Sequence, residues 1–402
     1  MATTDTNRGQ SGTGKAADRL FFHYCALYLF IFFGYGAFYP LLTQYYTSIS
    51  LSGTEIGVIS AITPVVSIVA QPLWGMICDR YQIRKPVLIL VLAATGLIAL
   101  LFTLVSSFAW VLVLFIVFSL FQSAIVPVSD SMALTYAKQR NTPFGNIRLW
   151  GAVGFALAAY VTGLGVEEWG PSAIFFIFCA SLLTAVLFLR QVPGDGEQAR
   201  FGVSILAGLK DLLKIPRYML FMISAFFLFG SVNANNIWFA LYYQHIGGTV
   251  AGIGLAFLLF AGSEAPAMKL ATVFIRRWGL EYTILLGGLI SAGRWLWYGT
   301  APSTTWVIAM FFIQGFSVGF YLASASQYVR ENTPASLQVT ALAIFAAVGQ
   351  GLGTMVCNLA AGLIADYAGI LSVYWFFGIA TLIGMIPMVL ICFGPYRQKA
   401  TQ

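Results

Sequence analysis

The chain has 402 residues, of which 59% are hydrophobic and only 9% are charged, and its formal net charge is +7. This composition excludes an ordinary soluble domain, because soluble proteins carry a much larger share of charged side chains. The positive excess reflects where basic residues are placed around membrane segments, with some attraction to anionic lipid, and it does not indicate a nucleic-acid partner.

Twelve runs of about 20 predominantly apolar residues divide the sequence, and each is long enough to cross the hydrocarbon core of a bilayer as a helix. We therefore predict an all-α membrane protein with twelve transmembrane helices. In chain order the runs lie near residues 20–45, 55–77, 86–105, 109–135, 146–165, 171–189, 217–243, 251–275, 282–300, 304–328, 337–364 and 370–392.

The basic residues avoid every second connection between these runs. Of the 21 Lys and Arg residues, three (Arg148, Lys269 and Arg294) lie inside runs, and all the others lie in the termini or the even-numbered loops. Basic residues stay in the cytoplasm, so both termini are predicted to be cytoplasmic in a multi-pass protein of the cell membrane. No cleavable signal precedes the first run, which can itself direct insertion. This sequence style fits a bacterial inner membrane.

The longest interior polar stretch separates the sixth run from the seventh. Apolar residues recur at helical spacing from Val203 to Lys214, which predicts an amphipathic helix on the inner membrane face; a plain linker with one short helix fits equally well. The predicted organisation is a disordered cytoplasmic tail over 1–19, an N-terminal six-helix bundle over 20–189, a cytoplasmic linker over 190–216, a C-terminal six-helix bundle over 217–392 and a cytoplasmic tail over 393–402.

The two halves read as copies of each other. The segment Gly151-Ala-Val-Gly154 resembles Ala346-Ala-Val-Gly349 at an offset of 195 residues. The loop Asp79-Arg80-Tyr81 matches Arg276-Arg277-Trp278 at an offset of 197 residues. Similar offsets at two places favour duplication over chance, and they predict two pseudo-symmetric bundles.

The loop after the second run contains Gly75, Asp79, Arg80, Arg84 and Lys85, and it resembles the G-x-x-x-D-R-x-G-R-R/K signature of the major facilitator superfamily. The resemblance implies parallel six-helix halves that rock around a substrate near mid-membrane. Gly75 would let a neighbouring helix approach closely. Asp79 would accept hydrogen bonds from a helix N-terminus or pair with a basic residue, forming a cytoplasmic gate with Arg80 and Arg84. The alternative is a basic loop that only retains topology. The usual second glycine is Ile83 here.

Ionisable residues inside membrane spans are costly, so they are functional hypotheses by default. The stretch from Phe144 to Phe155 resembles the fifth span of the lactose permease and its relatives, which include nucleoside/proton symporters and phenylpropionate permeases. The resemblance implies that Asp130 and Arg148, eighteen residues apart, hold the substrate and that Phe155 stacks against it. The alternative is a structural ion pair between two helices.

The C-terminal half follows the same resemblance with its charges replaced by amides. Asn233 and Asn236 stand at the positions of two acids, and Gln314 and Gln350 stand at those of a histidine and a lysine. We predict that these four amides bind substrate, with interhelical hydrogen bonding as an equal alternative. The replacements argue against lactose as substrate and against the lactose permease's own proton path.

Glu264 and Arg294 are the predicted proton-coupling pair. Burial disfavours the charged form of a carboxyl group and a neighbouring arginine favours it, so a substrate that draws Arg294 away would let Glu264 take up a proton. A fixed structural role for the pair is the alternative. Lys269, five residues from Glu264, points to another face of its helix and is expected to reach the membrane interface.

These features predict a secondary active transporter of a sugar, nucleoside or aromatic acid, working by alternating access as a proton symporter. A proton-coupled exporter is the alternative; exporters of this superfamily usually carry G-P-x-x-G-G in the fifth span, which has no proline here. An enzyme or receptor is disfavoured, because no cluster of nucleophiles, metal ligands or P-loop residues is visible. We expect no cofactor or metal. The expected partners are the small-molecule substrate, protons and lipid, and the default oligomeric state is a monomer.

Overall fold

In the computed structural model, which describes residues 7–194 and 209–395, the chain is built from helices that run back and forth. The long helices are α1 (Asn7–Phe38), α3 (Gly53–Tyr81), α4 (Arg84–Leu101), α5 (Phe108–Gln139), α6 (Phe144–Trp169), α7 (Ala173–Arg190), α9 (Pro216–His245), α10 (Val250–Trp278), α11 (Leu280–Tyr298), α12 (Thr304–Glu331), α14 (Thr354–Ala368) and α15 (Ile370–Phe393). Shorter helices include α2 (Leu42–Ser48), α8 (Leu209–Leu212), α13 (Gln338–Phe345) and the π-helix η4 (Ala346–Gly353).

Ten segments among the described residues are long and apolar enough to cross a membrane. An eleventh is α10, which bends by 41° where its two parts, Val250–Glu264 and Pro266–Trp278, meet. Proline removes a backbone donor and crowds the preceding turn, which accounts for the bend. The 19-residue helix α11 is not among these apolar segments, but it packs against α12 and α15 and brings the long helices of the described chain to twelve.

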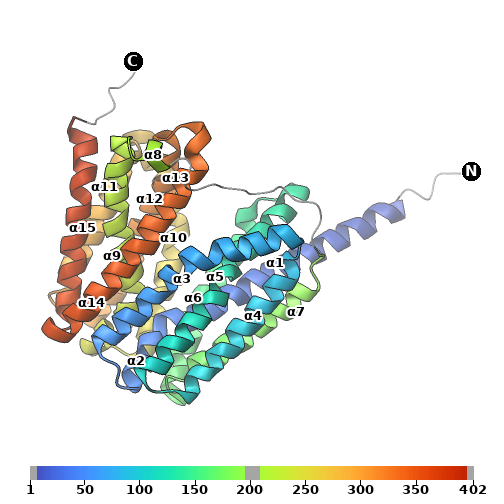
Figure 1. The fold of residues 1–402 in the computed structure, drawn as a ribbon, viewed down its shortest axis with the longest axis horizontal. Coiled ribbons are helices and arrows are strands. Elements are labelled where there is room, and N and C mark those ends of the chain that lie inside the picture. Colours follow the sequence, from blue (N-terminus) through green and yellow to red (C-terminus); the bar gives the residue numbers. More distant parts are fainter. Residues whose placement is uncertain (1–6, 195–208, 396–402) are drawn as a thin grey trace, which may run out of the picture.

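The helices form two bundles, α1–α7 and α9–α15, which lean together at one end and separate toward the other (Figure 1). We call the end from which both chain termini leave the terminal side, and the other end the distal side. Basic residues Arg80, Arg84, Arg276 and Arg277 all lie at the terminal side, at the ends or starts of their helices.

Equivalent helices in the two bundles begin with the same kind of N-cap, a side-chain hydroxyl that accepts a backbone hydrogen bond. Ser52 caps α3 by accepting a hydrogen bond from the backbone N–H of Glu55, and Thr249 caps α10 by accepting one from Gly252. The two caps are 197 residues apart, the offset seen in the loop motif. Side-chain oxygens at this position satisfy N–H groups that have no partner within the helix.

A second equivalence corrects the predicted alignment of the fifth and eleventh spans. A Cβ atom at Gly154 would collide with the backbone carbonyl of Leu29, and one at Gly353 would collide with that of Phe226. Only glycine permits helices to approach this closely. Gly154 therefore corresponds to Gly353, at an offset of 199 residues, and the predicted offset of 195 was wrong by about one helical turn. The offset thus grows by two residues between the caps and this glycine pair, and the eleventh span contains the π-helix η4, which ends at Gly353.

The ends of the described segments differ from the prediction in two places. Helix α1 begins at Asn7, so residues 7–19, which were predicted to form a disordered tail, continue the first span as helix. No proline stands between Asn7 and the apolar run, so a helix formed by that run can extend backwards. Of the predicted amphipathic helix over Val203–Lys214, the structure contains α8; residues 195–208 lie outside the described part.

All five cysteines lie among the described residues, where they are buried within the bundles and no disulfide joins them. They behave there as small apolar side chains that fill space between helices.

Candidate functional site

A cavity of about 330 Å³ lies where the two bundles meet. Aromatic, hydroxyl and amide side chains from both halves line it. Its lining residues are Tyr39, Pro40, Leu42, Ser60, Thr63, Pro64, Phe115, Phe155, Asn233, Asn236, Ile237, Phe257, Gln350 and Thr354. None of these is charged, and the volume is at the lower end of small-molecule sites.

The cavity lining is ordered by the internal repeat. At the offset of 197 residues Tyr39 corresponds to Asn236, and Ser60 corresponds to Phe257. At the offset of 199 residues Phe155 corresponds to Thr354. Each of the three positions thus contributes an aromatic ring from one half and a hydrogen-bonding side chain from the other. The internal repeat therefore places an apolar side chain and a polar side chain at equivalent positions on opposite halves of the cavity.

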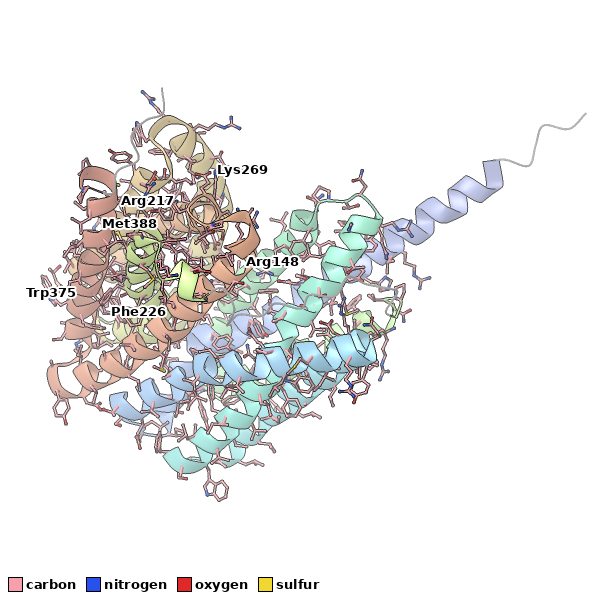
Figure 2. The ribbon with its side chains drawn as sticks, turned by 45° about the horizontal axis from the view of Figure 1, so that its top comes forward. Arg148, Arg217, Phe226, Lys269, Trp375 and Met388 are labelled. Atoms are coloured by element: carbon pink, nitrogen blue, oxygen red, sulfur yellow. The ribbon has the colours of Figure 1, made fainter. Side chains whose placement is uncertain are left out.

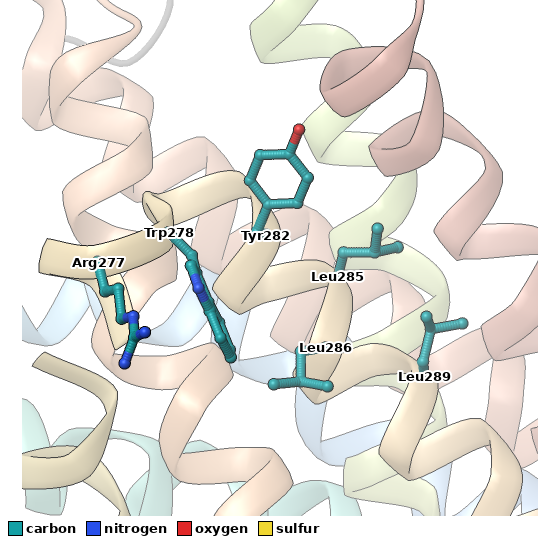
Figure 3. Close-up of a pocket in the computed structure, with 6 residues that line it drawn as sticks. All are labelled: Arg277, Trp278, Tyr282, Leu285, Leu286 and Leu289. Atoms are coloured by element: carbon teal, nitrogen blue, oxygen red, sulfur yellow. The ribbon is translucent and has the colours of Figure 1, made fainter. Parts of the chain in front are cut away.

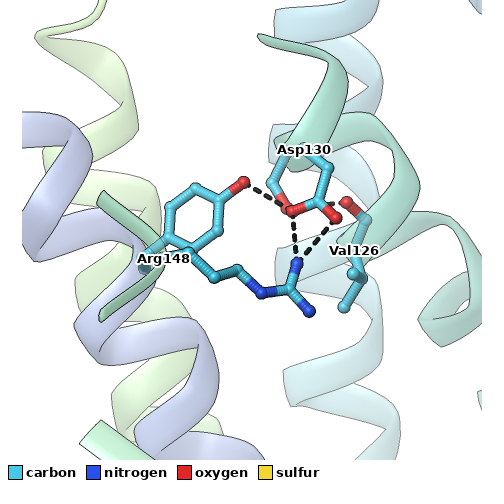
Figure 4. Close-up of polar contacts among 5 residues, drawn as sticks. Val126, Asp130 and Arg148 are labelled. Carbon is cyan, nitrogen blue, oxygen red and sulfur yellow. Dashed lines mark hydrogen bonds and ion pairs between the residues drawn. The ribbon is translucent and has the colours of Figure 1, made fainter. Parts of the chain in front are cut away.

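Asp130 on α5 and Arg148 on α6 form an ion pair (Figure 4). Arg148 Nη1 donates to Asp130 Oδ2 at 2.7 Å and to Oδ1 at 2.8 Å. Tyr28 of α1 donates its hydroxyl to Oδ1 at 2.6 Å, and the Phe32 ring lies 5.2 Å from the Arg148 guanidinium carbon. Arg148 stays 44% exposed, in the region where the bundles face each other (Figure 2). It therefore presents a positioned but accessible cation.

The sequence spacing places Arg148 and Phe155 on one helix. They are seven residues apart on α6, so they differ by about 10 Å along the helix axis. Arg148 lies toward the terminal side and Phe155 lies in the cavity wall. An elongated ligand could touch both.

Glu264 and Arg294, the predicted proton-coupling pair, do not form an ion pair in this structure. The charge that acts on Glu264 is that of Arg148, from the other bundle. Glu264 is the last residue before the bend in α10, and it is half-buried. Asp130, Arg148 and Glu264 therefore form one electrostatic group that crosses the junction between the bundles.

Arg294 lies instead in an aromatic environment inside the C-terminal bundle. Its guanidinium carbon is 5.0 Å from the Tyr298 ring centroid, 5.2 Å from that of Trp295 and 5.9 Å from that of Phe311. The residue is 5% exposed, and its guanidinium nitrogens have no hydrogen-bond partner among the described residues. Aromatic faces attract the cation, but they do not replace its lost hydration.

The four amides predicted to bind substrate divide into two groups. Asn233, Asn236 and Gln350 line the cavity, and Asn233 donates to Thr354 Oγ1 at 3.1 Å. Gln314 is 1% exposed, away from the cavity lining, and accepts a hydrogen bond from Asn235 at 3.4 Å. Its position in this structure fits the alternative role, interhelical hydrogen bonding, rather than substrate binding.

The loop after α3 makes its contacts within the N-terminal bundle. Asp79 accepts a hydrogen bond from Arg84 at 3.0 Å, and Gln82, with φ of 53°, adopts the left-handed conformation at the turn. Arg80 extends over Tyr81. Gly75 has open space where a Cβ would stand, so no helix approaches it here. The predicted gate contact between the halves is not formed in this conformation.

On the distal side, two acids connect the bundles. Asp366, at the end of α14, accepts hydrogen bonds from the backbone N–H groups of Gly53 at 2.6 Å and Thr54 at 2.7 Å, at the start of α3. Glu167, at the end of α6, accepts one from Ala251 at 3.0 Å, at the start of α10. Both carboxylates lie at the positive end of a helix dipole.

These two contacts are equivalent in the repeat, since Glu167 and Asp366 are 199 residues apart and Thr54 and Ala251 are 197 apart. We call them the distal caps. They hold the bundles together on the side where the helix backbones also touch, as at Gly57 against Asn358 and Gly254 against Ala159. The molecule is closed on the distal side.

Sequence reasoning missed Tyr28, Phe257, Glu167 and Asp366. Tyr28 donates its hydroxyl to Asp130 and so helps to position the ion pair. The aromatics Tyr28, Phe32 and Tyr35 recur at helical spacing, a signal that one face of α1 has a common role. The distal caps carried no such signal, because acids in short loops are ordinary.

A family model described as the MFS_1 like family matches residues 21–376. The maltose permease of Geobacillus stearothermophilus is 40% identical over 94% of this chain and 95% of its own length. The uncharacterized transporter YwbF of Bacillus subtilis is 39% identical over 90% of this chain and 92% of its own. The crystal structure of the nucleoside transporter NupG covers 93% of this chain and 99% of its own, with a TM-score of 0.83 at 16% identity, which shows a shared fold.

Proposed function

This chain belongs to the MFS_1 like family of major facilitator transporters, and we propose that it imports a neutral sugar of the maltose-type disaccharide class together with a proton. The observation that carries the proposal is the central cavity, with its uncharged lining and its repeat-related pairs of aromatic and hydrogen-bonding residues. The maltose permease relative supports the same class of substrate.

The chemistry of the cavity fits a pyranose ring. Such a ring has an apolar C–H face, which suits Phe155 or Phe257, and a rim of hydroxyl groups, which suits Asn236, Thr354 and Gln350. An organic acid would need an unpaired cation. The cavity wall holds no cation among the described residues, and Arg148, farther along α6, is already paired with Asp130. This favours a sugar over an aromatic acid.

Arg148 extends the proposed site toward the terminal side. Its Nη1 makes both bonds to Asp130, which leaves Nε and Nη2 free to donate to the hydroxyls of a second sugar ring. Charged donors make stronger hydrogen bonds than neutral ones. The separation of about 10 Å along α6 between Arg148 and Phe155 then favours a ligand longer than one ring.

The transport cycle follows from the closed distal side. With the basic residues in the cytoplasm, the distal caps close the outer side and the structure faces inward. Opening the outer side requires Asp366 and Glu167 to release the helices that they cap. The rocking of two bundles about the cavity then exposes the sugar to each side in turn.

Glu264 is the proposed proton carrier, with Arg148 in place of Arg294 as its regulating cation. When Arg148 is engaged by Asp130 and by a sugar, its attraction for the Glu264 carboxylate weakens. A carboxyl in a partly buried site then favours its neutral form. Sugar binding and proton uptake are coupled through a single guanidinium.

The test is uptake into proteoliposomes with an imposed pH gradient, using maltose, other disaccharides, monosaccharides, nucleosides and aromatic acids. We expect accumulation of one disaccharide class when the sugar-containing side is acidic, and none without a gradient. Preferred accumulation of a nucleoside or acid would contradict the substrate proposal. Accumulation only when the gradient drives protons against the sugar would indicate an exporter.

A further inference from the structure

A groove of about 560 Å³ runs along the outer surface of the C-terminal bundle, separate from the central cavity. It is lined by Arg277, Trp278, Tyr282, Leu285, Leu286 and Leu289. Figure 3 shows the three leucines following one another along α11, with Arg277 and Trp278 at the end where α10 joins it. One end of the groove is thus cationic and aromatic, and the rest is aliphatic.

The arginine at the mouth is available to a ligand. Glu281, the acid nearest to it in the sequence, is already engaged by Arg217 at 2.6 Å. No carboxylate pairs with Arg277 in the part of the chain that the structure describes, and the residue is exposed. Its charge is therefore uncompensated next to a hydrocarbon-like surface.

The groove is held in a fixed shape. Gly279, with φ of 92°, joins α10 and α11 with a single residue between them. The Trp278 ring packs edge-on against Phe274, with centroids 4.7 Å apart, and Tyr282 packs against Phe393 at 5.5 Å. These contacts orient the two aromatic side chains that border the mouth.

We propose that this groove binds one anionic phospholipid, with its phosphate on Arg277 and an acyl chain along Leu285, Leu286 and Leu289. Trp and Tyr favour the depth of lipid headgroups, so Trp278 and Tyr282 place the mouth at the membrane interface. The terminal side is the predicted cytoplasmic side, where anionic lipids attract basic residues next to helices. Arg277 supplies charge, and the leucines supply an apolar track that free phosphate cannot use.

The test is native mass spectrometry of the purified full chain, titrated with phosphatidylglycerol or phosphatidylcholine of identical acyl chains. We expect one phosphatidylglycerol to bind more tightly than phosphatidylcholine, and Arg277→Ala to lower that preference about fivefold. Arg277→Lys should keep most of it. Arg330→Ala, which removes an exposed arginine on the same side outside the groove, is the matched control and should leave the preference unchanged.

Two further measurements distinguish a bound lipid from a phosphate that binds Arg277 alone. Free glycerol phosphate should not displace the bound lipid, and Leu286→Ser should weaken both lipids alike by removing acyl contact. Equal losses in Arg277→Ala and Arg330→Ala would show a diffuse charge effect and overturn the proposal. So would displacement by glycerol phosphate, or a preference that survives in Arg277→Ala. None of these measurements depends on transport.

Discussion

Arg148 holds both carboxylate oxygens of Asp130 through one nitrogen, at 2.8 and 2.7 Å. The pair joins α5 to α6, and the hydroxyl of Tyr28 joins it to α1. An arginine with only a structural role would be expected to bind the carboxylate through two of its guanidinium nitrogens. Here Nε and Nη2 make no bond to the acid, and the side chain stays 44% exposed.

This geometry predicts that lysine will not replace Arg148. Arg148→Lys keeps the charge but loses the planar fork and the contact with Phe32, so sugar affinity should fall roughly 10- to 100-fold. Isothermal titration of the purified protein with the transported sugar measures the change. Lys269→Ala, which alters another exposed cation inside a span, should bind sugar as the parent does. Normal affinity in Arg148→Lys would assign the ion pair a structural role only.

Phe155 and Phe257 approach each other across the cavity, with centroids 6.3 Å apart and rings tilted by 66°. If one of these rings stacks on the C–H face of a sugar, Phe155→Ala or Phe257→Ala should lower affinity by roughly two- to tenfold beyond the change in thermal stability. Phe155→Tyr should retain binding because it keeps the ring. If both alanine variants bind sugar as tightly as the parent protein, aromatic stacking does not contribute to sugar binding.

Glu264→Gln tests the coupling. The amide cannot give up a proton, so uphill uptake driven by a pH gradient should disappear, whereas exchange of external for internal sugar should persist. Both rates come from the same proteoliposomes. Glu281→Gln changes an acid outside the cavity, so uptake by this variant should still be driven by the pH gradient. Gradient-driven uptake by Glu264→Gln would exclude Glu264 as the carrier.

The distal caps should bias the conformational equilibrium. A carboxylate that caps a helix contributes ~0.5–1 kcal/mol, so Glu167→Gln with Asp366→Asn should shift the balance toward molecules open on the distal side by roughly five- to thirtyfold. Distances between spin labels on the two bundles report that balance. Asp366 accepts two backbone hydrogen bonds and Glu167 accepts one, so Asp366→Asn alone should give the larger part of the free-energy change. An unchanged distance distribution in the double variant would show that the backbone contacts alone close this side.

Arg294 offers a stability prediction with an unusual sign. A buried charge without hydrogen-bond partners is costly, and even buried ion pairs can be replaced by apolar side chains with a gain of about 1–4 kcal/mol. Arg294→Met should therefore raise the thermal unfolding temperature, measured in detergent, relative to the parent. A lower temperature would show that the contacts of Arg294 with Trp295, Tyr298 and Phe311 outweigh the cost of its buried charge.

Much of the architecture was predictable because each part of it rests on a strong local signal. The length of the apolar runs identifies the spans. The distribution of basic residues among the loops predicts on which side of the membrane each loop lies. Asp130 and Arg148 stood out because an acid and a base inside neighbouring spans are costly unless they meet.

The site was less predictable where the outcome depends on which face of a helix a residue occupies. Asn233, Asn235 and Asn236 lie within four residues, yet Asn233 and Asn236 face the cavity and Asn235 faces Gln314 and Tyr374. A resemblance gives a position along the chain and leaves rotation about the helix axis undetermined. For the same reason the predicted pair of Glu264 and Arg294 was wrong. The bend beside Pro266 changes the direction of α10 at Glu264, and the sequence does not show this.

The burial of all five cysteines makes the unaltered chain a ready background for chemical labelling. With the native thiols shielded, Glu167→Cys or Asp366→Cys would introduce the one sulfhydryl open to a water-soluble maleimide. Its rate of alkylation, with and without sugar, would then follow the movement of the distal ends of the bundles, and no native cysteine would need to be removed.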